Sequence, residues 1–326
     1  MSIPSILKIL FELAVYPGVV FIVVLSLIYE WLDRKIVAHT QHRIGPLYTG
    51  PFGMLQPFAD ILKLLSKEDI TLPFSEKVMS SISVWLLLYL TLFGFYFIPT
   101  GAFGEKYSIL HFEGDYLIAL TILTLITIFT FLSGYSTFNR FALVGAARAI
   151  SLMVAYEIPA LICAAAIVIS SKTLCLSKIA MLQGRGGILK YYALTQPLGF
   201  IVFLICTQAE LERIPFDIPE AKQEIVAGWI TEFSGFKLAL LKLCFDVELF
   251  YSAALITTLY LGGPWAFGRT SILIFLAKTT IVVVILSIIR SIFARFRIDQ
   301  ALRFFWTRVM PLAFIQLIIV VFLYLR

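Results

Sequence analysis

Eight apolar segments, each long enough to cross a lipid bilayer, constrain the fold of this chain of 326 residues more than any other feature. A membrane-spanning helix needs about 20 mostly apolar residues. The composition agrees, because 60% of the residues are hydrophobic and 14% are charged, whereas soluble domains are about 45–50% apolar and about 25% charged. We therefore predict an all-α integral membrane protein with about eight transmembrane helices. The predicted spans cover approximately residues 13–31, 79–98, 116–135, 150–170, 194–209, 243–262, 271–289 and 309–325.

Lysine and arginine are distributed unevenly among the segments that join these spans. The loops after the first, third, fifth and seventh spans hold 6, 2, 4 and 5 of them, whereas the opposite loops and both tails together hold eight. Basic residues accumulate in cytoplasmic loops. We therefore expect loops at about 32–78, 136–149, 210–242 and 290–308 to face the cytoplasm, with both termini outside. The sequence contains no repeat or low-complexity linker, so we expect one polytopic domain over residues 1–326.

The first cytoplasmic loop contains an amphipathic pattern. Gly45-Pro46, Gly50-Pro51 and Gly53 interrupt helix formation before it. A short helix with one apolar and one charged side is typical of a helix that lies along the membrane surface, and we predict such an interfacial helix here. Its apolar side would hold Leu55, Phe58, Leu62 and Leu65, and its charged side Asp60, Lys63 and Lys67.

Residue types that commonly bind metals or act as nucleophiles are few and scattered. The four cysteines form no C-x-x-C pair, and the three histidines are too dispersed for a metal centre. The glycine-rich residues 184–187 lack the frame of a phosphate-binding loop, and no dinucleotide fingerprint is present. We therefore expect this chain to bind no metal or cofactor and to catalyse no covalent chemistry by itself.

Acidic residues concentrate between residues 208 and 248. Pro215 and Pro219 predict a non-helical connection, after which a helix from about Glu220 would place Glu220 and Glu224 on one face, where like charges are unfavourable. Carboxyl groups in a poorly solvated cavity have raised pKa values, so the pattern fits a proton relay. The alternative is a solvated loop whose acids pair with Arg213, Lys222 and Lys237. The eight acids are Glu210, Glu212, Asp217, Glu220, Glu224, Glu232, Asp246 and Glu248.

A ninth acid, Glu157, lies within a predicted span. It follows Tyr156 and precedes Ile158-Pro159, about half a dozen residues inside the apolar run. A carboxylate at the bilayer centre costs about 2.5–3.5 kcal/mol on insertion scales, and such residues mark ion or proton paths. We therefore include Glu157 among the proton-path candidates, with snorkelling toward Arg148 as the alternative.

Four sequence blocks resemble a known family. They are LDRK (32–35) with QHRIGP (41–46) and GMLQP (53–57), GAARA (145–149) with YEIP (156–159), the acidic loop with PFD (215–217), PEA (219–221) and EFSG (232–235), and RFRIDQ (295–300) with Trp306 and Pro311. Together they are similar to subunit 1 of respiratory complex I and to the corresponding subunit of energy-converting membrane hydrogenases. The blocks occur in the same order over nearly the whole chain.

The resemblance implies a subunit that joins a redox arm to a membrane arm. The intramembrane carboxylates and the acidic loop would then begin the proton path, and several other charged residues would order these acids or dock the arm. The candidates for ordering or docking are Arg34, Arg43, Arg148, Arg213, Arg295, Arg297 and Asp299. The implied partners are hydrophilic hydrogenase-like or complex I-like subunits, which would hold the [NiFe] centre and iron–sulfur clusters, and antiporter-like membrane subunits.

Departures from the quinone-using members favour one branch of the family. In this chain Lys222 takes the place of the second glutamate in the Pro-Glu-Ala-Glu motif of those members, and Asp33 takes the place of the glutamate in their Glu-Arg-Lys motif. Leu152 lies where they have a glutamine, and Ala294 lies where they have a proline before Arg-x-Arg. The EIVAG and EFSG motifs are similar to those of archaeal membrane-bound hydrogenases and sulfane sulfur reductases. We therefore predict a ferredoxin-driven complex of that type in a prokaryotic, archaeal-type cell membrane.

Other functions remain open at this point. The main alternative is the quinone-chamber subunit of a complex I type enzyme that oxidises NADH, F420H2 or ferredoxin. A second alternative is an autonomous ion channel or transporter, although the sequence lacks the inverted repeats typical of transporters. A third alternative is a purely structural anchor. The residues leave open whether H⁺ or Na⁺ is pumped.

Overall fold

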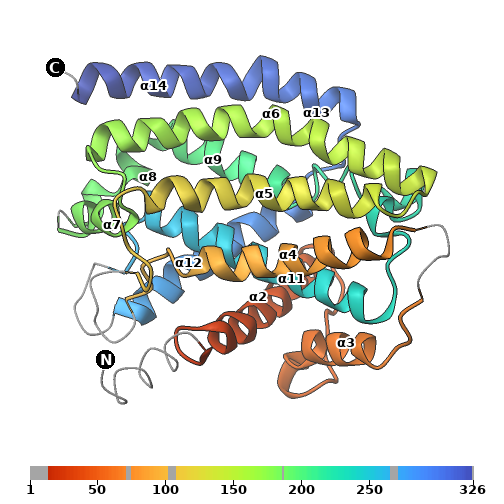
Figure 1. Cartoon of the computed structure of the whole chain (residues 1–326). Coiled ribbons are helices and arrows are strands. Elements are labelled where there is room, and N and C mark those ends of the chain that lie inside the picture. The colour runs from red at the N-terminus through yellow and green to blue at the C-terminus, as the bar shows by residue number, and fades with distance from the viewer. Residues whose placement is uncertain (1–13, 71–74, 102–107, 186, 265–270, 325–326) are drawn as a thin grey trace.

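A computed structural model describes residues 14–70, 75–101, 108–185, 187–264 and 271–324, and these residues form helices and loops without a strand. The long helices lie side by side in one bundle (Figure 1). The α-helices are α2 (Val19–Thr40), α3 (Gln56–Leu65), α4 (Lys77–Phe95), α5 (Asp115–Tyr135), α6 (Arg140–Ser171), α7 (Leu176–Arg185), α8 (Tyr192–Thr195), α9 (Pro197–Glu210), α10 (Lys222–Ile225), α11 (Gly235–Tyr260), α12 (Ser271–Ile292), α13 (Ile298–Phe304) and α14 (Met310–Tyr324). Short 3-10 turns are η1 (Pro51–Gly53), η3 (Ile188–Lys190) and η4 (Gly228–Ile230), and a π-helical turn, η6 (Phe305–Val309), joins α13 to α14.

Helix α11 is the centre of the bundle. Every residue from Asp246 to Tyr260 is buried, and α2, α4 and α12 pack against it. A helix that is apolar on all sides is stable only when other elements surround it. The aromatic side chain of Phe250 contacts Tyr29 of α2 and Phe95 of α4, with ring centroids 5.1 and 4.5 Å apart. These contacts fix α11 between α2 and α4 near the acidic residues Asp246 and Glu248.

Five helices are long and apolar enough to cross a membrane among the residues that the structure describes. They are α4, α5, α6, α12 and the continuous helix Ile298–Tyr324. The other three predicted spans fall on α2, α9 and α11. Helix α9 has 14 residues, and α2 carries Glu30, Asp33, Arg34 and Lys35 in its second half. The structure thus supports a membrane protein with five candidate spans, and the total of about eight remains a prediction.

Several helices extend beyond the apolar runs of the sequence. Helix α6 begins at Arg140, inside the expected loop 136–149, because the side chain of Asn139 accepts a hydrogen bond of 2.9 Å from the backbone N–H of Phe141 and caps the helix. Helix α2 continues to Thr40. Hydropathy does not detect these polar ends, although they place charged residues at the end of the bundle where the acidic loop lies.

The expected helix from Glu220 is much shorter in the structure. Only α10, with four residues, is helical there, and Glu220 precedes it. Val226 and Gly228 have φ values of 63° and 58°, which end the helix. Glu220 and Glu224 therefore do not share a long helical face, and they contact different surroundings.

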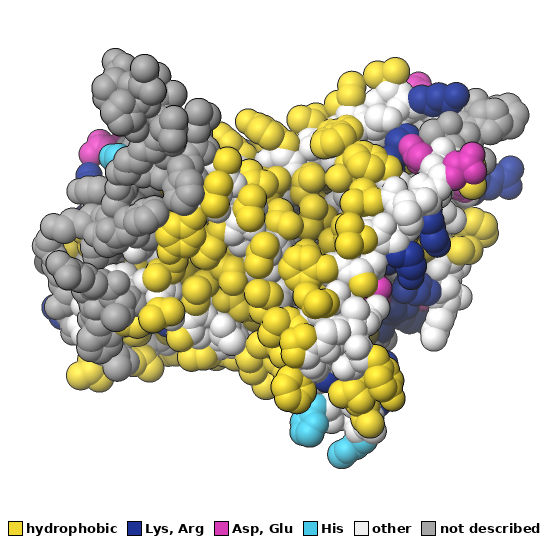
Figure 2. Space-filling view, turned by 90° about the horizontal axis from the view of Figure 1, so that it is seen from below, with side chains coloured by type: hydrophobic (Ala, Val, Ile, Leu, Met, Phe, Trp, Pro, Cys, Tyr) yellow, Lys and Arg dark blue, Asp and Glu magenta, His cyan; other side chains and the backbone are white. Residues whose placement is uncertain are grey.

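The surface of the bundle has an apolar middle. Figure 2 shows hydrophobic side chains over the central part of this face, with Lys, Arg, Asp and Glu gathered at the end that includes α3. The start of α2 and the end of α14 both lie at the opposite end, on opposite sides of the bundle (Figure 1). This arrangement is typical of a membrane protein whose charged residues occupy the aqueous face.

Candidate functional site

The acidic loop, residues 211–234, packs tightly against α6. A Cβ atom at Gly145 of α6 would lie 2.7 Å from the backbone nitrogen of Trp229 and 2.9 Å from the carbonyl oxygen of Pro219. At Gly228, a Cβ atom would lie 1.8 Å from the same Pro219 oxygen. Only glycine allows the backbone segments to approach so closely at these two positions. Trp229 itself is 0% exposed, so the loop is a fixed part of the bundle.

A cavity of about 320 Å³ lies between this loop and the ends of the neighbouring helices. It is lined mainly by charged side chains, which come from α2, α3, α11, α12 and the loop itself. Such a cavity is large enough and polar enough to hold several water molecules. Its charged lining residues are Glu30, Arg34, Asp60, Glu212, Arg213, Asp217, Glu220, Lys222, Lys242, Asp246 and Arg290.

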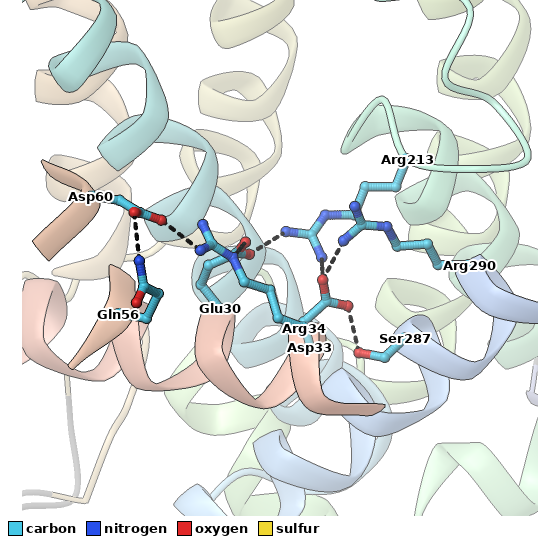
Figure 3. A network of polar contacts seen from close by, with 8 residues as sticks. All are labelled: Glu30, Asp33, Arg34, Gln56, Asp60, Arg213, Ser287 and Arg290. Atoms are coloured by element: carbon cyan, nitrogen blue, oxygen red, sulfur yellow. Dashed lines mark hydrogen bonds and ion pairs between the residues drawn. The ribbon is translucent and has the colours of Figure 1, made fainter. Parts of the chain in front are cut away.

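A continuous network of ion pairs lies beside this cavity and contributes Glu30, Arg34, Asp60, Arg213 and Arg290 to its lining (Figure 3). Asp33, which is 0% exposed, contacts Arg213 at 3.0 Å and accepts hydrogen bonds from Ser287 at 2.7 Å and from Arg290. Arg213 also contacts Glu30 at 3.3 Å. A buried carboxylate that faces two guanidinium groups is compensated in charge, so the network joins the loop to α2 and α12 without leaving an isolated buried charge.

The same network continues to α3. Arg34 contacts Glu30 at 2.8 Å and Asp60 of α3 at 2.7 Å. The side-chain amide of Gln56 donates to the other oxygen of Asp60 at 2.9 Å. Partial burial alone would raise the pKa of Asp60, but the hydrogen bonds from Arg34 and Gln56 outweigh it and lower the pKa below its ordinary value. Asp60 is therefore an ionised acid that binds α3 to α2.

The acids on the loop have the opposite electrostatic character. Burial raises the pKa of Glu220 to about 7, and the Asp217 carboxylate adds to this effect, whereas Lys222, Arg213 and Arg290 oppose it. Burial raises the pKa of Glu212 well above its ordinary value, and Glu220 raises it further. Glu220 can therefore bind and release a proton near neutral pH, as a relay requires, and burial favours the protonated form of Glu212.

Glu212 and Arg213 are neighbours in the acidic loop, and their side chains contact different elements. The backbone at Glu212 is left-handed, with a φ of 49°, a conformation that non-glycine residues adopt only when their surroundings hold them. The Glu212 carboxylate accepts a hydrogen bond of 3.1 Å from the indole N–H of Trp229, whereas the Arg213 side chain contacts α2. The turn thus places a protonatable acid and a fixed cation beside the same cavity.

A second, smaller cavity of about 30 Å³ contains Glu157 of α6 and Glu210 at the end of α9. Its volume suffices for one water molecule. One buried carboxylate oxygen of Glu210 has no hydrogen-bond partner among the described residues. Glu248 is 5% exposed and lies on α11, two residues beyond Asp246. The structure thus brings Glu157 and Glu210 together apart from the larger cavity.

Other predicted residues lie away from the centre of both cavities. Glu224 is half-exposed and pairs with Arg148 at 2.6 Å, and Glu232 accepts a hydrogen bond from the side chain of Asn139. Arg295 pairs with Asp217 at the edge of the larger cavity. The docking role predicted for the surface residues remains a prediction. Those exposed at the surface are Arg43, Arg297 and Asp299.

Several members of the charged network have no role in the site that the sequence predicts. Asp33 stands out in the sequence only within a family motif and Asp60 only on the charged side of the interfacial helix, whereas Glu30 and Arg290 do not stand out there. Glu30, Asp33, Asp60 and Arg290 belong to three different helices, and each by itself is typical of a charged helix end. The one available signal is the spacing of Glu30, Asp33 and Arg34, which puts two acids and a base on adjacent turns of an otherwise apolar helix. Their meeting with Arg213 depends on tertiary structure.

No group of three or more His, Cys, Asp or Glu side chains is arranged to hold a metal ion within the described ranges. The site offers carboxylates, guanidinium groups and water-sized cavities. These groups can store protons and move them between neighbouring acids.

Comparisons with known proteins cover nearly all of this chain. The sequence matches the family described as NADH dehydrogenase over residues 13–321. A chain in the solved structure of "the membrane-bound sulfane sulfur reductase (MBS), an archaeal respiratory membrane complex" is similar, with a TM-score of 0.83 and 26% sequence identity. The match covers 98% of this chain and 100% of that chain. The similarity therefore includes the bundle and the elements that line the two cavities.

Proposed function

Because the chain belongs to the NADH dehydrogenase family of complex I subunit 1-like proteins, we propose that it is the membrane-anchoring and proton-coupling subunit of an energy-converting redox complex. The family match confirms the resemblance that the four sequence blocks indicate. The subunit would link electron transfer in a peripheral arm to ion translocation in the membrane.

The larger cavity is the observation on which this proposal rests. It places Glu212 and Glu220, whose pKa values burial raises, beside the fixed cations of the charged network in a space of about 320 Å³. We propose that these acids exchange protons with the cytoplasm and that Glu210, Glu157 and Glu248 continue the path into the membrane. Asp217, Asp246, Glu224 and Glu232 are the further candidates.

The proposed topology has about eight membrane crossings, with both termini outside. Within the described ranges, five helices meet the requirements of length and hydropathy, and α2, α8–α9 and α11 would provide the others. In this arrangement α3 lies along the cytoplasmic membrane surface. Leu55, which directly precedes α3, is 48% exposed, and Leu62 and Leu65 of α3 are 67% and 42% exposed. This exposure is expected of a helix whose apolar side contacts lipid.

The similarity to a chain of the sulfane sulfur reductase supports the ferredoxin-driven hydrogenase or sulfur reductase type over a quinone enzyme. The iron–sulfur clusters and any [NiFe] centre would then lie in hydrophilic partner subunits on the cytoplasmic face, and antiporter-like subunits would adjoin the bundle in the membrane. Quinone reduction by the purified complex, lost on bulky substitution in residues 32–78, would instead support the quinone alternative.

Charge-neutral substitution in the intact complex tests the proposal. We expect Glu212→Gln, Glu220→Gln and Glu157→Gln each to reduce proton uptake by vesicles at least about tenfold, because an amide cannot be ionised. Electron transfer measured with the uncoupled complex should change less. The matched control is Glu113→Gln, which removes an exposed acid paired with Lys178 and should leave uptake unchanged.

Normal uptake in a variant that combines Glu157→Gln, Glu212→Gln and Glu220→Gln would contradict the proton relay and favour a structural anchor. Ion flux through liposomes that contain this chain alone would instead support an autonomous channel. We expect no such flux, because the proposed subunit works only with its partners.

A further inference from the structure

We propose that Asp33 is a positioning residue that holds the Arg213 and Arg290 guanidinium groups away from the protonatable acids of the larger cavity. This inference rests on the proposed proton-coupling function. Asp33 itself is completely buried and is not among the residues that line the cavity, whereas both arginines are. Its influence on the acids would therefore act through the two arginines.

The contacts of Asp33 come from two elements other than its own. Arg290 and Ser287 lie one turn apart on α12, and Arg213 reaches Asp33 from the acidic loop. The two carboxylate oxygens have different partners: Ser287 donates to one, and both arginines contact the other. For Arg290, Asp33 is the single ion-pair partner in the described part of the chain.

The arginines have an alternative set of partners within the cavity. Glu220 and Asp217 line the same space, and positive charge from Arg213 and Arg290 favours the ionised form of Glu220. An arginine released by Asp33 could turn toward these acids, because a guanidinium group binds any nearby carboxylate strongly. Asp33 thus keeps Glu220 protonatable near neutral pH.

Other charged groups also line the cavity and contribute to the electrostatic potential at its acids. Glu30 also holds Arg213 at 3.3 Å, so loss of Asp33 should release Arg290 more completely than Arg213. The remaining charged groups come from the loop and from three helices. They are Glu212 and Lys222 on the loop, Lys242 and Asp246 on α11, Arg34 on α2 and Asp60 on α3.

Two substitutions in the intact complex should shift the pH profile in opposite directions. A relay acid must be protonated during each cycle, so the alkaline limb of the pumping rate reports its pKa. Asp33→Asn removes a negative charge and frees the arginines, which should move this limb about one pH unit lower. Arg290→Gln removes a cation near Glu220 and should move the limb higher.

Two further variants test for an indirect structural effect. Asp33→Glu keeps the charge and should restore the limb toward its wild-type position. Ser291→Ala changes another serine on α12, whose hydroxyl donates to the Ile288 carbonyl oxygen of its own helix, and should leave the profile unchanged. A merely structural role of Asp33 would lower the rate at every pH without moving the limb.

An unchanged limb in Asp33→Asn, or a shift in the same direction in Asp33→Asn and Arg290→Gln, would overturn the inference. If the complex with Asp33→Asn does not assemble, Arg290→Gln alone decides. An alkaline limb that stays in place or moves to lower pH in Arg290→Gln then overturns the inference. Normal pumping after Glu212→Gln and Glu220→Gln would instead refute the proposed function. A different result would refute only this inference: Glu212→Gln and Glu220→Gln abolish pumping, but the alkaline limb does not move in Asp33→Asn or in Arg290→Gln.

Discussion

At the scale of single residues, the site combines two kinds of carboxylate. Asp33 and Asp60 are ionised acids that pair with guanidinium groups, and they hold helices together. Glu212 and Glu220 form no ion pair of this kind within the described residues, and burial raises their pKa values. A partly buried acid of the second kind lowers stability when it ionises, and acids with strongly raised pKa values cluster at functional positions.

This difference predicts how stability depends on pH. The folded pKa of Glu220 is about 7, above its ordinary value of 4.5, so the folded state loses stability as pH rises from 4.5 to 7. Glu220→Gln removes this loss, and the variant should be more stable than wild type at pH 8 by up to about 3 kcal/mol. The two should be equally stable below pH 4.5. Thermal denaturation of the purified complex at both pH values measures the difference.

Glu224→Gln is the matched control for this prediction. Glu224 is half-exposed and pairs with Arg148, so its substitution should give no gain at pH 8. An equal gain in both variants would show that general surface charge, rather than burial of Glu220, sets the pH dependence.

The sequence predicted these acids but not their surroundings. A cluster of carboxylates next to an apolar segment is visible in the sequence, and the structure places four of them around one cavity. The sequence could not show that Glu224 leaves this group, because α10 ends after one turn. It also could not show Asp33 between Arg213 and Arg290, since contacts across more than 150 residues depend on how the helices pack. The four acids at the cavity are Glu212, Asp217, Glu220 and Asp246.

At the scale of elements, α3 depends on its neighbours for stability. It has 10 residues, and isolated helices of this length are marginal in water. The buried residues Pro57 and Leu64 and the Arg34–Asp60 ion pair connect it to the rest of the bundle. The sequence predicted a helix here from its apolar spacing, whereas the ion pair that fixes it was not predictable from local pattern.

Neutralising Asp60 should loosen α3 specifically. Asp60→Asn weakens the hydrogen bonds from Arg34 and Gln56, and a bond to a charged group contributes about 1.5–3 kcal/mol, less when exposed. Amide hydrogen exchange over residues 56–65 should therefore become about tenfold faster. Lys63→Gln changes an exposed charge on the same helix and is the control. Equal acceleration in both variants would contradict the role of the ion pair.

At the scale of the whole molecule, the positions of the first and last helices restrict the topology. The start of α2 and the end of α14 lie at the same end of the bundle (Figure 1), which requires an even number of crossings. Among the described residues, five helices meet the hydropathy and length requirements, so the proposed topology needs further crossing segments. Apolar runs predicted these segments, but α9 has 14 residues and would extend only about 21 Å, less than the hydrocarbon thickness of about 30 Å.

The segment before α9 explains how this crossing can be completed. Helix α8 ends at Thr195 and α9 begins at Pro197, with Gln196 between them. The Gln196 side chain donates to Ser170 at 2.9 Å and accepts from Gln316 at 3.2 Å, so the interruption is buried in protein. Irregular backbone is tolerated at membrane depth in that situation.

Single cysteines on either side of α8–α9 test this crossing. Leu189 is 83% exposed before α8, and Gln223 is exposed after α9, whereas the four native cysteines are buried. A membrane-impermeant thiol reagent should label Leu189→Cys from outside intact cells and Gln223→Cys only in inverted vesicles. Ser66→Cys, next to α3, should react like Gln223→Cys. Labelling of Leu189→Cys and Gln223→Cys from the same side would mean that α9 does not cross. If both react from outside intact cells, the acidic loop faces the outside.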